Sequence, residues 1–539
     1  MKVFPFLLLL LLSVVMLSEA QTYDLLIKNG RIVDGTGSPW YTGDVAIKDE
    51  RIVAIGKLSN ASAKRSIDAT GLIVAPGFID MMGQSAASFI KDPNTALNLL
   101  TQGITTINAG EGGSDAPLSD EEAKIQGWKT MRQYFTKLET AGMPMNMVQT
   151  VGHTQVRYLV IGDKDRQATP KEMATMRGMV QEAMEAGAIG LSTSLIYPPA
   201  IYGSEEEIAE LAKVAGKYGG RYFTHMRNEG DRLIEAIDEA LRIGKAAGTP
   251  VHIFHLKAAG QANWGKMDMA IARIKEARTN GQEVGVDIYP YINNGLGILA
   301  LLHPRHAAEG QDALQEKLKD PKVRAVMREE METLAGWENW FAHAGKNWDR
   351  IVVAHLEDTP YAAYNGNTIG AIAKAENKSP WDVFFDLTAY DVFAMPQTMS
   401  EVNKMKAMRE EFTSFDTDAG PAATGYAVHP RGYGAFPRVL SHYVKGLGVL
   451  SLEGAIQRMS AVAANEIMAY DRGMLAPGLA ADIVLFDFNT IEDRATFASP
   501  ATLSEGVKWV IVNGKVVIEN NMYTGAKPGK VIRGPGYKP

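Results

Sequence analysis

Residues 221–255 read RYFTHMRNEGDRLIEAIDEALRIGKAAGTPVHIFH, and this stretch decides the fold. Residues 221–225 and 251–255 are short apolar runs with the length of buried strands. Between them, residues 229–248 have the amphipathic period of a helix and end at a glycine. A strand, a helix and a second strand in this order predict a β-α-β unit with parallel strands.

The same alternation of apolar runs and helix-period stretches extends over about 76–470. The strand candidates are 73–80, 103–109, 146–151, 188–192, 221–225, 251–255, 284–288 and 412–415. Because these eight candidates alternate with helix patterns, the sequence predicts an α/β fold with a (β/α)8 TIM-like barrel. A doubly wound sheet is the alternative, but no Gly-rich phosphate loop follows the first strand.

The two ends of the chain differ from its middle. Residues 21–75 and 471–539 contain short strand patterns without helices between them, so we expect both ends to pair in one small β-sandwich domain. The barrel then covers 76–470. Residues 289–411 are too long for a single crossover and contain extra helix patterns, so we expect an insertion there.

The N-terminal segment has the features of a signal peptide. Lys2 precedes a leucine-rich apolar run over 3–17, and residues 18–20 offer small side chains at the cleavage positions before Gln21. The apolar run is shorter than the ~20 residues that a spanning helix needs. An uncleaved anchor is the alternative. We therefore expect residues 1–20 to be a signal peptide and the protein to be periplasmic or secreted, with no other membrane contact.

Composition excludes several classes of function. The chain has 539 residues and a net charge of −7, from 55 basic and 62 acidic residues, and no basic run stands out. Nucleic acid is therefore not an expected partner. Cysteine is absent. This excludes a cysteine nucleophile, a thiolate metal ligand and a lipoprotein anchor.

Histidines end both strands of the quoted stretch, at His225 and His255. Side chains at the C-terminal ends of barrel strands converge on the mouth of the barrel, so the two imidazoles could bind one metal ion. Two histidines buried in the core without a ligand role are the alternative.

The sequences around both histidines resemble the D-aminoacylase (N-acyl-D-amino-acid deacylase) branch of the amidohydrolases. These segments are Tyr222-Phe-Thr-His-Met-Arg-Asn-Glu-Gly230 and His252-Ile-Phe-His-Leu-Lys-Ala-Ala-Gly260. Other segments similar to that branch lie, in the same order as in the branch, at 152–157, 187–199, 287–291, 418–420, 429–438 and 475–482. Residues 73–80 also resemble the opening barrel strand of the superfamily. The resemblance implies a metal-dependent hydrolase of amide bonds.

The resemblance also implies a set of metal ligands. In this branch, zinc is bound by the histidines after the fifth and sixth strands, which His225 and His255 match, and by a cysteine after the second strand. The cysteine is missing here, and Glu111 lies one position before its aligned place. A carboxylate can replace it, so we expect Glu111 as the third ligand. A turn carboxylate that faces solvent is the alternative.

A second metal ion in the family would need a His-x-His pair at the tip of the first strand. Met82 and Gln84 stand there instead, and neither is a good ligand for a hydrolytic metal. We therefore expect one Zn²⁺ per chain, with Met82 and Gln84 filling the vacated space.

Asp418 closes the eighth strand, where the resemblance implies the general base and acid of the reaction. Asp416 would share its face of an extended strand and is the alternative base. The residues expected to contact substrate are Lys257, Tyr197, Tyr289, His153, Arg157 and Arg431. A structural hydrogen bond in a barrel loop is the alternative for each of these six.

These features together predict an exported hydrolase that cleaves the amide bond of N-acyl-D-amino acids or related N-acyl compounds. Its partner is then a small-molecule N-acyl amino acid. One alternative keeps the same centre but acts on dipeptides or cyclic amides. The other is a non-catalytic binding protein that has lost its metal site.

Overall fold

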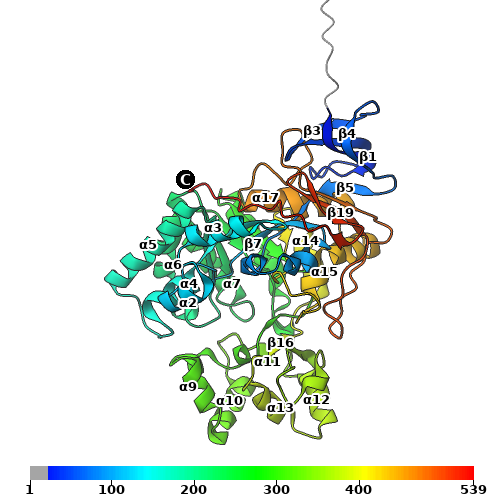
Figure 1. Ribbon diagram of the computed structural model, residues 1–539. Helices are drawn as coiled ribbons and strands as arrows, with labels where there is room; N and C mark the ends of the chain where they lie inside the picture. Colours follow the sequence, from blue (N-terminus) through cyan, green and yellow to red (C-terminus); the bar gives the residue numbers. More distant parts are fainter. Residues whose placement is uncertain (1–21) are drawn as a thin grey trace, which may run out of the picture.

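The computed structural model describes residues 22–539, so the expected signal peptide lies outside the described residues. A central α/β body carries a small β-rich part at one end and a helical lobe at the other (Figure 1). Within residues 22–539, no helix is both long and apolar enough to cross a bilayer.

A closed ring of parallel strands forms the central body. The strands are β6 (Phe78–Asp80), β7 (Ile104–Ala109), β8 (Asn146–Gln149), β9 (Val151–Gly152), β10 (Gly190–Ser194), β11 (Arg221–His225), β12 (Val251–Ile253), β13 (Val284–Ile288) and β17 (Thr413–Phe415). They form two sheets, ordered β6-β7-β8 and β9-β10-β11-β12-β13-β17. Only Thr150 separates β8 from β9, so the pair acts as one barrel strand. The ring closes where the Met81 amide donates to the Phe415 carbonyl at 3.2 Å.

Helices cover the outside of this ring (Figure 1). They include α1 (Leu97–Leu100), α3 (Met131–Ala141), α4 (His153–Ile161), α5 (Pro170–Ala186), α6 (Glu205–Lys217), α7 (Leu233–Ala247), α8 (Lys266–Thr279), α14 (Glu401–Arg409) and α15 (Arg431–Arg438). Local sequence sets the ends of these helices: Thr169 forms a capping box with Glu172 before α5, and Gly187 ends that helix with a positive φ. Helices α5, α6, α7 and α8 pack in series, each against the next.

Strands from both ends of the chain share one nine-stranded sheet. The N-terminal strands are β1 (Tyr23–Ile32), β2 (Tyr41–Lys48), β3 (Arg51–Gly56), β4 (Ala63–Asp68) and β5 (Ile73–Pro76). The C-terminal strands are β18 (Ile483–Phe486), β19 (Val507–Val512), β20 (Lys515–Glu519) and β21 (Met522–Tyr523). Antiparallel pairing of β5 with β18 joins the two sets, and Ile27, Ile47, Ile483 and Ile511 lie in their common core.

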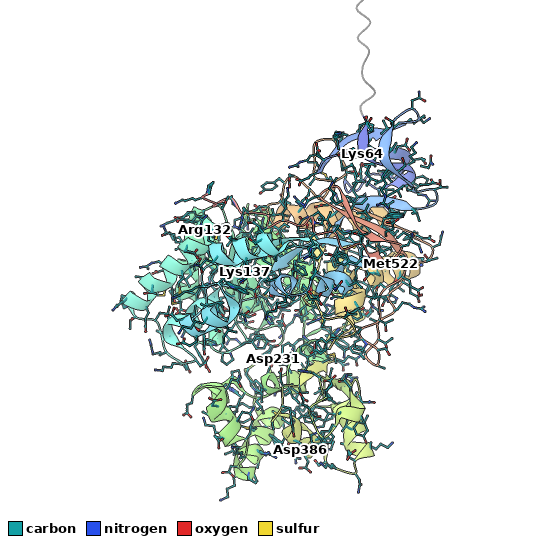
Figure 2. The ribbon with its side chains drawn as sticks, in the orientation of Figure 1. Lys64, Arg132, Lys137, Asp231, Asp386 and Met522 are labelled. Atoms are coloured by element: carbon teal, nitrogen blue, oxygen red, sulfur yellow. The ribbon has the colours of Figure 1, made fainter. Side chains whose placement is uncertain are left out.

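A lobe with its own core lies between β13 and β17. It contains α9 (Gln311–Lys317), α10 (Pro321–Thr333), α11 (Trp340–His343), α12 (Ile369–Ala375) and α13 (Pro380–Leu387). A three-stranded sheet of β14 (Leu296–Gly297), β16 (Phe393–Pro396) and β15 (Ile351–Ala354) completes it. In Figure 2, Asp231 lies on the barrel where it faces this lobe, and Asp386 lies within the lobe. The lobe ends before α14, because α14 packs against α8 and β17 as a barrel helix.

Strands β10 and β11 approach closely at Gly190, so a larger residue cannot replace this glycine without strain. A Cβ atom there would lie 1.9 Å from the carbonyl oxygen of Arg221, whereas one at Gly178, inside α5, would meet nothing within 4 Å. We predict that Gly190→Ala destabilises the protein by about 3 kcal/mol through overpacking. Gly178→Ala should stabilise it by about 0.5–1 kcal/mol, because alanine has the better helix propensity.

Thermal and denaturant unfolding of both variants beside the wild type would measure these effects. A Gly190→Ala protein with an unchanged unfolding midpoint would contradict the close strand approach at β10.

Candidate metal centre and active site

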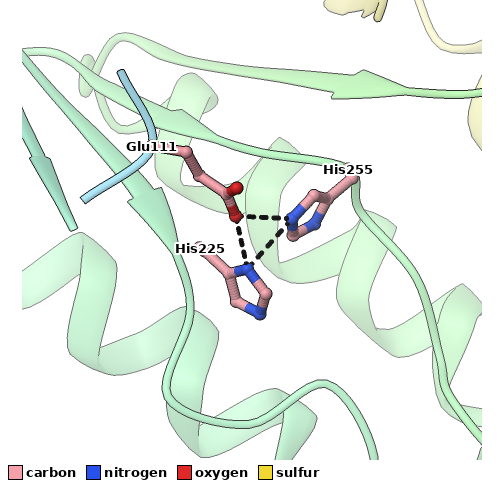
Figure 3. Close-up of side chains that lie close together, drawn as sticks. All are labelled: Glu111, His225 and His255. Carbon is pink, nitrogen blue, oxygen red and sulfur yellow. Dashed lines mark hydrogen bonds and ion pairs between the residues drawn. The ribbon is translucent and has the colours of Figure 1, made fainter. Parts of the chain in front are cut away.

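Three side chains from three barrel strands meet at the mouth of the barrel (Figure 3). Glu111 follows β7, His225 ends β11 and His255 follows β12. The His225 Nδ1 atom lies 2.7 Å from Glu111 Oε1, and the His255 Nε2 atom lies 3.3 Å from the same oxygen. The two ring nitrogens are 3.1 Å apart. Each residue therefore presents one ligand atom to a common point.

This donor set fits a zinc ion. One ligand atom from each of the three residues lies within 4.8 Å of the other two. Tetrahedral zinc with bonds of about 2.0–2.2 Å places its ligand atoms about 3.3 Å apart. Two of the three separations, 3.1 and 3.3 Å, are close to this value, and the His225–Glu111 separation of 2.7 Å has the length of a hydrogen bond. Two imidazoles and one carboxylate also form a known catalytic ligand set that leaves a position for water or substrate.

The loop after β7 is shaped to aim Glu111 into the barrel. The Ser194 hydroxyl donates to the Glu111 carbonyl at 3.0 Å, and the Gly112 amide donates to the Ser192 hydroxyl at 3.0 Å. Gly112 has a φ of +73°, and a Cβ atom there would lie 2.5 Å from the Ser194 amide nitrogen. Only glycine fits this close contact, so the loop path and the direction of Glu111 are set together.

A buried carboxylate, Glu229, supports both histidines from behind. Its Oε1 atom lies 3.0 Å from His255 Nδ1, and its Oε2 atom lies 3.6 Å from His225 Nε2. Lys257 pairs with the same carboxylate at 2.6 Å. The contact to His255 has the length of a hydrogen bond, which orients an imidazole and makes it a better ligand, whereas at 3.6 Å the interaction with His225 is one of charge alone.

The charges around Glu111 set its protonation state. Burial alone would raise the pKa of the Glu111 carboxyl, but hydrogen bonds and charge from His225 and His255 outweigh burial and hold the pKa well below its usual range. Glu111 is therefore ionised, as a metal ligand must be.

Asp418 reaches the cavity from the end of β17. Its φ is +44°, an unusual backbone conformation for a residue other than glycine. Just before it, the Thr417 amide and hydroxyl both donate to the Asp80 carboxylate, which holds the strand end in place. Arg431 pairs with Asp418 Oδ2 at 2.6 Å. Burial raises the pKa of Asp418, and the charge of Arg431 limits that rise.

The alternative base, Asp416, faces the interior of the barrel. Its side chain is fully buried, and burial together with the nearby Asp287 carboxylate raises its pKa well above the usual value. Asp418, in contrast, lines the cavity beside Glu111. The geometry favours Asp418 for proton transfer.

A cavity of about 640 Å³ opens over Glu111 and Asp418. The loop over 418–433 forms one wall, and Gly295, Leu296 and Phe393 of the lobe form another. A smaller hollow continues from it to the two histidines, with Trp340 of the lobe on its rim. The lobe therefore contributes walls to the site.

Four of the six residues expected to contact substrate border these cavities. Tyr197 packs edge-on against His225, with the ring centroids 5.6 Å apart. The ring of Tyr289 lies beside three cations, Lys404 at 4.2 Å, Arg431 at 4.7 Å and Lys257 at 5.8 Å from its centroid. Tyr197, Tyr289, Lys257 and Arg431 are thus brought together around the metal ligands.

The prediction that His153 and Arg157 contact substrate does not agree with the structure. Both lie on α4 with no exposed surface, and both bind Glu207 of α6. Arg157 pairs with Glu207 at 2.7 Å, and His153 Nε2 lies 2.9 Å from it. Glu207 satisfies the charge of the arginine, so the pair joins two helices and does not border the cavity.

The expectation that Met82 and Gln84 merely fill vacated space holds only for Met82. Met82 is buried in an apolar cluster with Ile79, Phe223 and Phe254. Gln84 lines the cavity and donates a hydrogen bond to Asp418. Sequence reasoning also missed Glu229. Its only signal was a carboxylate four residues after His225.

Comparison with known proteins agrees with this geometry. The model of the amidohydrolase family, Amidohydro_3, matches residues 65–518. The chain belongs to the amidohydrolase family. This amidohydrolase is 32% identical over 532 residues to the D-aminoacylase of Alcaligenes xylosoxydans xylosoxydans, covering 96% of this chain and 98% of that protein. It is 34% identical over 520 residues to the N-acyl-D-glutamate deacylase of the same organism, covering 95% and 96%.

A solved structure extends the comparison to the fold. The N-acyl-D-glutamate deacylase of Bordetella bronchiseptica, complexed with zinc and a phosphonate inhibitor, superposes with a TM-score of 0.81 at 30% identity. The match covers 95% of this chain and all of that one. The predicted barrel fold and the predicted resemblance to the D-aminoacylase branch are confirmed. This amidohydrolase is therefore an enzyme that hydrolyses carbon–nitrogen bonds, and the binding-protein alternative loses its support.

Glu229 provides a test of the metal centre. We predict that Glu229→Gln weakens zinc binding by about 10- to 100-fold, because the histidines lose a charged partner. Competition with a chromophoric chelator would measure the affinity. Glu235→Gln, an exposed position on α7, is the matched control and should bind zinc as the wild type does. Equal zinc affinity in all three proteins would show that Glu229 does not support the ligands.

Proposed function

We propose that this amidohydrolase is an exported deacylase with one zinc ion, and that it hydrolyses the amide bond of N-acyl-D-amino acids. The observation that carries the proposal is the group of Glu111, His225 and His255 beside Asp418 in one cavity. The named activities of the D-aminoacylase and of the N-acyl-D-glutamate deacylase support the class of substrate.

The charges that line the cavity suit a substrate with a free carboxylate. Arg431 is almost fully buried and borders the main cavity, and Lys257 borders the hollow near the histidines. A guanidinium and an ammonium group can both bind a carboxylate, and such bonds are stronger where water is excluded. We infer that these two cations hold the substrate carboxylate while the acyl amide lies over the ligand residues.

In this proposal, Asp418 transfers the proton from water to the leaving nitrogen. Zinc held by Glu111, His225 and His255 would supply Lewis-acid activation of water and of the amide carbonyl. The ionised Asp418 carboxylate can accept a proton from the attacking water and then donate it to the leaving nitrogen. A group that first accepts the proton of water and then donates it to the nitrogen keeps the proton count balanced, and Asp418 lies in the hollow beside the candidate ligands where it can do both.

Metal content and substrate selectivity test the proposal together. We predict about one zinc per purified chain and faster hydrolysis of N-acetyl-D-amino acids than of the L-enantiomers. Elemental analysis would measure the metal. A panel of D- and L-substrates, with dipeptides and cyclic amides included, would measure selectivity. Cleavage confined to dipeptides or cyclic amides would overturn the proposed substrate class.

Removing the base should separate metal binding from turnover. We predict that Asp418→Asn keeps its zinc but loses about 10²- to 10⁴-fold in kcat, because an amide cannot accept the proton. In the wild type, activity requires the ionised carboxylate and is lost as pH falls through its pKa. Burial raises that pKa, so the acidic limb of the kcat/KM profile should lie above the pKa of an ordinary aspartate, 3.8. Turnover of Asp418→Asn near the wild-type rate would exclude Asp418 as the base.

A further inference from the structure

Gln84 links the metal ligand Glu111 to the base Asp418. Its side-chain nitrogen lies 3.0 Å from Glu111 Oε2 and 3.0 Å from Asp418 Oδ1. Both partners are carboxyl groups, Glu111 beside two imidazoles and Asp418 paired with Arg431, and ionised carboxylates only accept hydrogen bonds. The amide must therefore point its NH₂ group at both, and each of its two protons has one acceptor.

The backbone holds Gln84 in this position. The Gln84 carbonyl accepts a hydrogen bond from the Gly110 amide at 2.7 Å, and the preceding Gly83 amide donates to the Asn108 carbonyl at 2.8 Å. Gln84 has a φ of +57°, a conformation that glutamine adopts only where neighbouring bonds enforce it. The side chain leaves the tip of β6 in a set direction, toward the cavity that it lines.

The charge balance shows what this amide does. Glu111 is paired with His225 and His255, and Asp418 with Arg431. The remaining oxygen of each carboxylate faces Gln84, and two carboxylates that face each other repel unless a donor or a cation lies between them. A neutral NH₂ group satisfies both oxygens without adding a charge. It also occupies the space in which a second cation could bridge the two carboxylates.

We propose that Gln84 is a positioning residue. Its side-chain amide fixes the position of the base Asp418 relative to the ligand Glu111, and it prevents a second metal ion from binding between the two carboxylates. The inference rests on the proposed function, because Asp418 acts as a base only if the protein hydrolyses amides. The part that concerns metal binding can be tested without any substrate.

Gln84→Met tests the positioning role, since methionine has a similar length but no N–H donor. We expect one zinc per chain, a kcat about 10- to 100-fold lower and a KM changed by less than about 3-fold. A kcat within about 2-fold of the wild type would overturn the role. Gln181→Met, the same substitution on the exposed side of α5, is the control and should leave kcat unchanged.

Gln84→Glu tests the metal-excluding role with nearly the same shape. The substitution places a third carboxylate between Glu111 and Asp418, and carboxylates together attract a divalent cation. Metal-free protein would be dialysed against excess Zn²⁺ and analysed for bound metal. We expect about two zinc ions per chain in Gln84→Glu and about one in the wild type. One zinc in both proteins would overturn this role.

The two readouts separate failure of the inference from failure of the proposed function. Wild-type protein that binds one zinc but cleaves no N-acyl amino acid would refute the proposed function, and the zinc count of Gln84→Glu would still decide whether Gln84 excludes a second ion. Wild-type protein with D-selective activity and a Gln84→Met variant of equal kcat would leave the function intact and refute the positioning role.

Discussion

Burying the Glu111 carboxylate at the mouth of the barrel would cost several kcal/mol unless polar or charged groups contacted it. Both of its oxygens are contacted: His225 and His255 lie at one, and the Gln84 amide at the other. These partners come from three strands that only a closed barrel brings together. The same contacts prepare a binding site for a metal ion, because groups that stabilise the ionised carboxylate also direct it toward the histidines.

A second group of buried charges supports the first. Glu229 lies behind both histidines and is paired with Lys257, so its charge is compensated where no water reaches it. The lobe takes part as well, since the Glu338 carboxylate accepts a hydrogen bond from the Glu229 backbone amide at 2.9 Å. The lobe therefore has a second role besides lining the cavity. It also fixes the segment from which the histidines receive their support.

The segment after β6 carries no metal ligand at Met82 or Gln84 and still takes part in the site. Histidine pairs at this place would add metal ligands, whereas this chain has one apolar and one amide side chain there. Met82 lies in the core, and Gln84 donates to two carboxylates. The chain also has no cysteine, and Glu111 offers a carboxylate oxygen, which is not oxidised as a thiolate is.

Local patterns in the sequence predicted the barrel, although the first candidate strand, 73–80, is divided in the structure between β5 of the nine-stranded sheet and β6 of the barrel. Apolar runs of strand length, helix periods and caps depend on neighbouring residues, so they can be recognised without coordinates. The places of His225, His255 and Asp418 at strand ends follow from the same patterns, because parallel strands of a barrel end at one face. Glu111 was expected only from the family resemblance.

Only the tertiary structure decided which polar side chains share a partner. His153 and Arg157 lie at a strand end in the sequence, yet both turn to Glu207 on a neighbouring helix, more than forty positions along the chain. Gln84 looked like a filler because its two acceptors, Glu111 and Asp418, lie 27 and 334 residues away. A hydrogen bond depends on distance and direction in space, and neither is written in the local sequence.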